Sequence, residues 1–164
     1  MSNRKRNREV SCSPPPPVEG ITQQLNSIHF PPKRRREALE EVYEEGDHGR
    51  TEYMINNKGQ REGLYKSYFS NGQMREMANY DKGERFGLVQ QWFPNGHPFE
   101  LYTMAFGLRN GAAITWFSSG MIRCYENYKE GALDSSCVYY NEAGQKQIER
   151  VYSQGTVINE EYFD

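Results

Sequence analysis

The chain has 164 residues and a formal net charge of −2; 13% of its residues are aromatic and 26% are charged. This length suffices for one ordinary domain with a buried core. No stretch approaches the roughly 18 consecutive apolar residues of a membrane-spanning helix, and no apolar run follows the basic start, as it would in a signal peptide. The three cysteines, Cys12, Cys124 and Cys137, include no close pair, which favours a reducing compartment. We therefore expect an intracellular protein, cytoplasmic or nuclear and not secreted.

The charge divides the chain into a basic arm and an acidic body. Residues 1–36 carry eight Lys or Arg against two Glu, a net of +6, whereas residues 37–164 carry twelve Lys or Arg against twenty Asp or Glu, a net of −8. The arm has few large apolar residues, so it cannot bury enough surface to offset its ordering entropy. We predict a disordered arm over 1–36 and a folded body over 37–164. The basic residues of the arm are Arg4, Lys5, Arg6 and Arg8, then Lys33, Arg34, Arg35 and Arg36.

Residues 33–45 allow two interpretations. Leu39, Val42 and Tyr43 would share one face of a helix, but the basic cluster would then lie at the positive end of the helix dipole. The alternative is a strand that ends at Val42–Tyr43 and pairs, through a loop over 44–49, with residues 50–55. We favour the strand slightly, because it makes a degenerate first unit of the repeats described next.

From residue 59 onward, glycine recurs in steps of 24 residues. A repeat of this length indicates a stacked array of one supersecondary unit. The first series is Gly59, Gly83, Gly107, Gly131 and Gly155, and the second is Gly72, Gly96, Gly120 and Gly144. A third, shorter series is formed by Gly63, Gly87 and Gly111 and ends at Ser135.

The two glycine series place two chain reversals in each unit. Asn71–Gly72 and Asn95–Gly96 predict hairpins, because Asn and Gly both tolerate the positive φ of a type I′ turn. Two reversals in 24 residues leave strands of about six to eight residues. A crossover helix does not fit into such a unit. We therefore predict an all-β protein, an elongated antiparallel meander of about five units whose first and last are degenerate.

Aromatic residues hold the same 24-residue register. Strand alternation puts residues such as Leu88, Gln90 and Trp92 on one face and Val89 and Gln91 on the other. Neither face is uniformly apolar, which favours a thin single sheet over a two-layer sandwich. We expect the aromatic columns to form the core, with a partner site as the alternative. These columns are Tyr68, Trp92, Trp116 and Tyr140; Phe69, Phe93 and Phe117; and Tyr80, Tyr128 and Tyr152, with Met104 in the third.

The units resemble the MORN repeat family in its variant form, which occurs in bacterial proteins described as antitoxins and in repeat proteins of some large DNA viruses. The likeness rests on the segments 63–72, 87–96 and 111–120, each followed by a second glycine reversal. It covers roughly residues 42–164. The last unit departs from the pattern at Ser135, Asn141 and Ala143, as a terminal cap would. The resemblance implies an elongated β-hairpin array and leaves the function open.

Catalytic and metal-binding patterns find little support. His97 lies beside a turn glycine, where the other units carry Gln73, Met121 and Gln145, so an ordinary turn residue explains it. Cys124 and Cys137 fall on successive predicted strands and could approach each other, but buried inert thiols are the commoner case. Neither zinc-ligand spacing nor a phosphate-binding loop occurs. We expect no enzyme, no cofactor and no metal.

Recognition by an extended repeat surface remains. The leading hypothesis is a protein-interaction or structural scaffold module with a protein partner, and self-association through its open ends is a further option. A second hypothesis gives the basic arm a role in nuclear import or nucleic-acid binding. A third, from resemblance alone, is an antitoxin-like neutraliser of a partner protein. Binding to membranes by the acidic repeats is not expected, because anionic lipid attracts basic segments.

Overall fold

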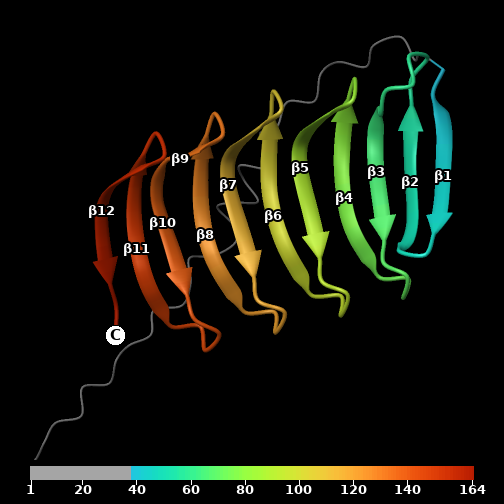
Figure 1. The fold of residues 1–164 in the computed structure, drawn as a ribbon. Helices are drawn as coiled ribbons and strands as arrows, with labels where there is room; N and C mark the ends of the chain where they lie inside the picture. The colour runs from blue at the N-terminus through green and yellow to red at the C-terminus, as the bar shows by residue number, and fades with distance from the viewer. Residues whose placement is uncertain (1–37) are drawn as a thin grey trace, which may run out of the picture.

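A computed structural model describes residues 38–164. They form one open sheet of twelve antiparallel strands, and the strand order follows the chain except that the short β9 and β10 both pair with β8 (Figure 1). The predicted all-β meander is therefore confirmed. The strands are β1 (Glu40–Gly46), β2 (Gly49–Ile55), β3 (Gly63–Tyr68), β4 (Met74–Asp81), β5 (Glu84–Trp92), β6 (Pro98–Ala105), β7 (Leu108–Trp116), β8 (Ile122–Lys129), β9 (Ala132–Leu133), β10 (Ser135–Tyr140), β11 (Lys146–Ser153) and β12 (Thr156–Tyr162).

The N-terminal strand exists but is longer than predicted. β1 continues to Gly46, where it pairs with Gly49 of β2, so the predicted loop over 44–49 is a turn of only Asp47 and His48. Glu44 and Glu45 stay in the strand because their Cα partners, Thr51 and Arg50, continue the antiparallel ladder. The predicted arm over 1–36 lies outside the described residues.

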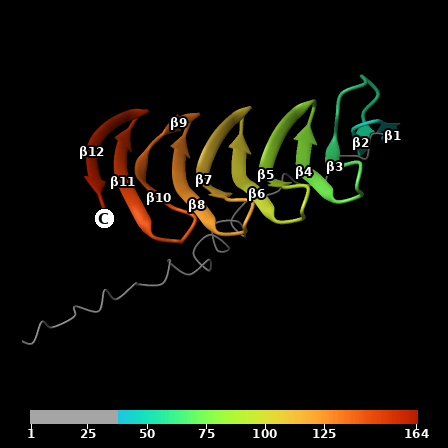
Figure 2. The ribbon, with the colours of Figure 1, turned by 60° about the horizontal axis from the view of Figure 1, so that its bottom comes forward.

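The strands bend where the ladder shifts register. In the hairpins whose turns lie at the lower edge of Figure 1, shifts occur between Ser67 and Tyr68, Gln91 and Trp92, Thr115 and Trp116, and Tyr139 and Tyr140. In the hairpins of the upper edge, shifts occur between Met77 and Asn79, Tyr102 and Met104, and Val151 and Tyr152. An extra residue in one strand bends that strand and increases its twist. Figure 2 shows the strands from β4 onward bowed along their length. The column of Tyr68, Trp92 and Trp116 lies at one of the two sets of register shifts.

Most of the buried side chains lie on one face of the single sheet, here called the core face. Ile114, which is also buried, alternates with Ala113 and lies on the other face. Antiparallel partners place Tyr65 beside Ala78 and Val89 beside Tyr102 on the core face. Ala78 and Val89 have no solvent exposure, because neighbouring tyrosine rings cover them: Tyr65 packs against Tyr80 with ring centroids 5.6 Å apart. The residues of this cluster are Tyr65, Ala78, Tyr80, Val89, Tyr102 and Ala113, with Tyr53, Met104 and Tyr128 packed against it.

This core corrects the predicted one. Of the three aromatic columns, only the one containing Tyr80, Tyr128 and Tyr152 contributes buried residues, Tyr80 and Tyr152. Side chains of the other two columns are half-buried: Tyr68, Trp92, Trp116 and Tyr140, and Phe69, Phe93 and Phe117. They lie next to the lower turns, where no second layer of the described chain covers them, whereas small residues at the strand centres are enclosed by tyrosines.

The two glycine series form two different turns, and the type I′ turns are not where the sequence predicted them. At the upper edge in Figure 1, Lys82, Phe106, Glu130 and Gln154 have φ of 50°, 51°, 50° and 50°, and a left-handed glycine follows each. Two successive positive φ values define type I′. At the lower edge only the glycine is left-handed, as at Gly72 with φ 85°, which fits a type I turn followed by a glycine bulge.

Asparagine therefore serves the lower turns through its side chain and not through its φ. The Asn71 amide donates to the Pro94 carbonyl and the Asn95 amide donates to the Ser118 carbonyl, each at 2.8 Å. Each side chain thus ties its own turn to the corresponding turn of the next unit. Their Oδ1 atoms also accept from the backbone N–H two residues ahead, at 3.0 Å.

Two further departures from the 24-residue pattern are structural. Gly59 belongs to the first series by spacing, yet its turn has the hydrogen bonds of the lower turns. The Asn56 N–H donates to the Gln60 carbonyl at 2.9 Å, as the Phe69 N–H donates to the Gln73 carbonyl in a lower turn. In the earlier units the strand after the upper turn is continuous, as in β5 and β7. In the last unit the corresponding strand is interrupted at Asp134 and forms β9 and β10. Ser135 keeps the positive φ of the third glycine column, at 69°. At Ser135 the sequence departs from the glycine pattern, whereas the backbone conformation is kept and pairing continues through β10, β11 and β12.

Candidate interaction surface

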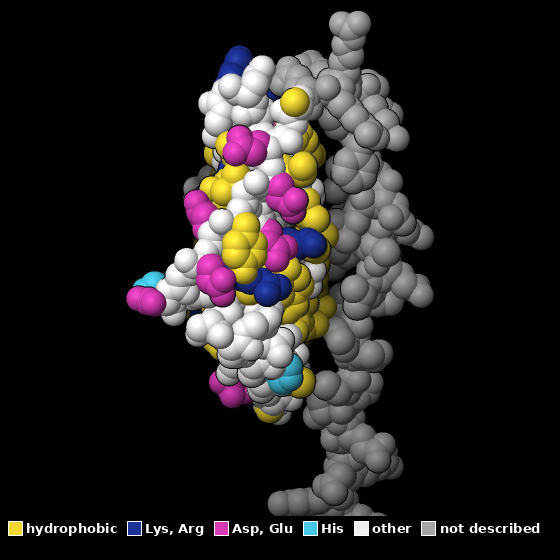
Figure 3. All heavy atoms as spheres, turned by 90° about the vertical axis from the view of Figure 1, so that its right-hand side faces the viewer, with side chains coloured by type: hydrophobic (Ala, Val, Ile, Leu, Met, Phe, Trp, Pro, Cys, Tyr) yellow, Lys and Arg dark blue, Asp and Glu magenta, His cyan; other side chains and the backbone are white. Residues whose placement is uncertain are grey.

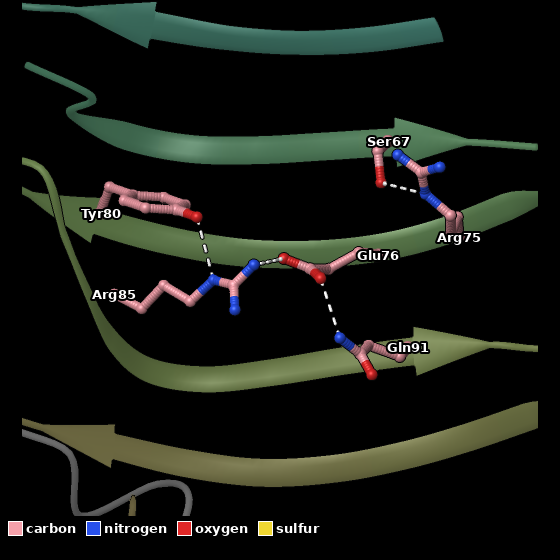
Figure 4. Close-up of polar contacts among 6 residues, drawn as sticks. All are labelled: Ser67, Arg75, Glu76, Tyr80, Arg85 and Gln91. Atoms are coloured by element: carbon pink, nitrogen blue, oxygen red, sulfur yellow. Dashed lines mark hydrogen bonds and ion pairs between the residues drawn. The ribbon is translucent and has the colours of Figure 1, made fainter. Parts of the chain in front are cut away.

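Charged side chains on the core face are used within the array. The Arg85 guanidinium contacts the Glu76 carboxylate at 2.5 Å and donates to the Tyr80 hydroxyl at 2.9 Å (Figure 4). Gln91 donates to the other Glu76 oxygen at 2.8 Å. Burial is the largest single influence on the Arg85 guanidinium and lowers its pKa. The negative charge of Glu76 and the hydrogen bond to Tyr80 together outweigh burial, so the pKa of Arg85 is raised. The guanidinium therefore stays charged and paired.

The same arrangement recurs one unit later. Arg109 lies 2.7 Å from Glu100, and its guanidinium stacks over the rings of Tyr102, at 4.1 Å, and Tyr128, at 5.4 Å. Burial, more than any other influence, raises the pKa of Tyr128, to about 12. In the first unit, Arg61 stacks over Tyr80 and two further tyrosines. The core face is thus a set of satisfied arginine, glutamate and tyrosine contacts.

Sequence reasoning missed this network. A signal was present, because Arg61, Arg85 and Arg109 recur at 24 residues, as do Glu76 and Glu100. Within residues 38–164, no buried side-chain nitrogen or oxygen lacks a hydrogen-bond partner. A face whose polar groups are already paired offers little to a ligand. The edges and turns of the array are therefore the better candidates for a binding surface.

The upper row of turns contains one residue that breaks the local rules. Phe106 is 96% exposed and occupies the first position of a type I′ turn, at φ 51°. The equivalent residues of the other units, Lys82, Glu130 and Gln154, are polar. A left-handed conformation costs a bulky L-residue roughly 1–2 kcal/mol, and an exposed ring gains nothing from folding. Phe106 therefore has no evident role in stability.

An exposed leucine and the side chains of the two flanking turns surround Phe106. Leu108, two residues on, is 48% exposed and leans toward the next turn, where a Cβ at Gly131 would lie 3.3 Å from its Cδ2 atom. The flanking turns present Lys82 and Glu130. Successive turns on this edge are two strands apart, roughly 10 Å from the spacing of paired strands. We call Lys82, Phe106, Leu108 and Glu130 the upper turn surface.

Other predicted site residues have ordinary surroundings or lie outside the description. His97 is exposed in its turn, and its Nδ1 lies 2.8 Å from the Ser118 carbonyl. Cys124 and Cys137 are buried free thiols on the core face of neighbouring strands β8 and β10; burial raises the pKa of Cys124 to about 11. The basic residues Arg4, Lys5, Arg6, Arg8, Lys33, Arg34, Arg35 and Arg36 are not among residues 38–164.

Residues 38–164 contain no group of three or more His, Cys, Asp or Glu side chains placed to hold a metal ion. Over the same range, no helix has the length and apolar character needed to cross a membrane.

Comparison with known families supports the resemblance seen in the sequence. The family described as MORN repeat variant matches residues 61–82, which run from Arg61 through β3 and β4 to the turn at Lys82. This confirms the suspected family for that unit. No curated protein matches the chain. Repeats of this family are generally non-catalytic and serve as protein-interaction modules, so a repeat-based interaction or scaffold role is supported at that level.

Proposed function

We propose that this protein is a non-enzymatic scaffold that holds a protein partner at the upper turn surface, with Phe106 as the anchoring side chain. The observation that carries the proposal is the 96% exposure of Phe106 at a left-handed backbone position. Local rules of folding are most often broken at functional sites. Aromatic anchors commonly supply most of the binding energy of an interface.

The chemistry of the upper turn surface indicates what the partner must offer. The partner needs an apolar pocket for one phenyl ring, with Leu108 packing at its rim. Because Lys82 and Glu130 lie on the two sides of Phe106 along the row, a complementary partner has an acidic group on one side of this pocket and a basic group on the other.

Substitution of Phe106 tests the proposal. Phe106→Lys removes the ring but keeps a residue that the chain itself uses at this turn position, in Lys82, so the fold and melting temperature should not change. Partners are captured with the full chain, identified, purified and titrated calorimetrically. Loss of an anchor worth about 2 kcal/mol raises Kd roughly 30-fold.

A matched control separates the anchor from the turn. Lys82→Gln changes the equivalent position one unit earlier, to the residue found at Gln154, and should alter Kd far less than Phe106→Lys. If Phe106→Lys binds every captured partner as tightly as the unchanged chain, Phe106 is not the anchor. If deletion of residues 1–36 abolishes all partners while Phe106→Lys keeps them, the array is only a spacer.

The charge asymmetry favours a second candidate, in which the arm binds nucleic acid or directs nuclear import. Residues 1–36 carry a net +6, in contrast to the net −8 of residues 37–164. Binding through the arm predicts an affinity that falls steeply with salt concentration. Deletion of residues 1–36 should remove that affinity, and Phe106→Lys should leave it unchanged.

A further inference from the structure

The sheet ends in two strands that pair on one side only within the described residues. β1 pairs with β2, and β12 pairs with β11. The outer side of such a strand presents unpaired N–H and C=O groups, which can extend the sheet with another strand. The two edges differ in charge and in apolar exposure, and this difference determines which one can be extended.

The β1 edge is protected by like charge. Four of its seven residues are exposed glutamates, Glu40, Glu41, Glu44 and Glu45, and Asp47 follows in the turn. None of these four forms an ion pair within residues 38–164. Figure 3 views the molecule from the β1 end and shows several acidic side chains on it. Charged side chains are a common protection against edge-to-edge pairing.

The β12 edge has the opposite character. All seven of its residues are exposed, and its first four, Thr156 to Asn159, are uncharged. Val157 is 45% exposed, Ile158 64% and Tyr162 67%. Of its two glutamates, Glu160 is already paired with Arg150 of β11. β12 is thus an apolar strand edge with one uncompensated charge, at Glu161.

We propose that two copies of the chain join through their β12 strands, antiparallel and in the register centred on Asn159, into one continuous sheet. In its pairing with β11, β12 carries an extra residue, Ile158, between Val157 and Asn159. β7 has the same kind of irregularity in its pairing with β6 and still pairs with β8 on its other side. The register centred on Asn159 sets Val157 opposite Glu161 and Ile158 opposite Glu160 of the second copy, so no glutamate faces a glutamate. A centre moved by one residue toward the C-terminus would oppose the two Glu160 side chains, which destabilises a cross-strand pair.

The same asymmetry limits the assembly to two copies. A contact between identical β12 strands is isologous and consumes both of them. Growth beyond the dimer would need β1 to pair, and a β1–β1 contact centred on Tyr43 opposes Glu41 with Glu45 on both sides. The assembly is therefore a closed dimer whose outer edges are the two β1 strands. This inference does not depend on the upper turn surface.

Sedimentation of the full chain over a wide concentration range tests the dimer. The expected mass rises from that of the 19.1 kDa chain to twice that value and does not increase further. Val157→Glu places a carboxylate opposite Glu161 at two symmetric positions and should raise the dimer Kd at least about tenfold. The double variant Val157→Glu with Glu161→Lys restores opposite charges there and should recover the dimer.

The matched control is Tyr43→Glu, which adds the same charge to β1 and should leave the dimer Kd unchanged. A chain that stays monomeric at every concentration overturns the proposal, as does a Val157→Glu variant that dimerises like the unchanged chain. Growth to larger assemblies overturns the closed dimer. If circular dichroism shows that Val157→Glu does not fold, Ile158→Glu, which meets Glu160 of the second copy, tests the same register with the same expected loss.

Discussion

Ser135 holds a backbone conformation that glycine adopts in the three preceding units, and exchanging the two residue types measures what that conformation costs. Its φ is 69°, and the φ of Gly87, two units earlier, is 68°. A Cβ at Gly87 would meet no atom within 4 Å, so only the backbone conformation disfavours a side chain there. The Ser135 hydroxyl has only one contact, to Asp134 at 3.5 Å, which adds little.

The magnitude follows from two opposing effects. An L-residue in the left-handed region costs about 1–2 kcal/mol, whereas glycine costs about 0.5–1 kcal/mol through its greater freedom in the unfolded chain. Ser135→Gly should therefore raise the free energy of unfolding by about 0.5–1 kcal/mol. Gly87→Ser should lower it by a similar amount, because the φ is nearly the same and the site is open.

The assay is urea unfolding of the full chain followed by tryptophan fluorescence, since Trp92 and Trp116 lie in neighbouring units. Ser135→Gly should move the midpoint to higher urea and Gly87→Ser to lower urea, both without a change in the slope m. An unchanged or lower midpoint for Ser135→Gly would refute the reasoning. It would mean that the glycine column is required by something other than φ.

Two further predictions follow from the turns and the buried thiols. Asn95→Ala removes the amide that bonds the Ser118 carbonyl and should lower the free energy of unfolding by about 1 kcal/mol, whereas Ser119→Ala, at the equivalent position of the next unit, should lower it less; equal losses in urea unfolding would contradict the bridging role. Cys124 and Cys137 should resist a thiol reagent at neutral pH, because burial raises the pKa of both thiols and the thiolate is the reactive form. Mass spectrometry should find both modified only in denaturant, and rapid labelling of either in the native protein would contradict the prediction.

Much of the fold could be predicted because the repeat makes each local signal occur several times. A single Asn–Gly pair predicts one hairpin, whereas Gly72, Gly96 and Gly120 at equal spacing indicate that one unit is repeated. The turn types could not be predicted in the same way. Lys82, Phe106, Glu130 and Gln154 share no chemistry, yet all adopt a left-handed φ, because the strands on either side impose a two-residue connection on them.

The candidate surface was predicted only in kind. An extended interaction surface followed from the repeat, but Phe106 was hidden in the sequence as one apolar residue among many. Its importance depends on exposure, which composition and spacing do not give. The network of Arg85, Glu76 and Tyr80 was missed for a related reason, since these residues look like scattered surface charges until the strands bring them onto one face.

The sequence by itself determined the unit, its length, the number of reversals and the point near Ser135 where the pattern weakens, because glycine placement is a local requirement of the backbone. Only the tertiary structure decided which face is the core, which turn is type I′ and which edge of the sheet is protected. Those properties depend on neighbours from other units. Ala78 is buried because tyrosines of adjacent strands cover it, and β12 is open because no further strand of the described chain follows it.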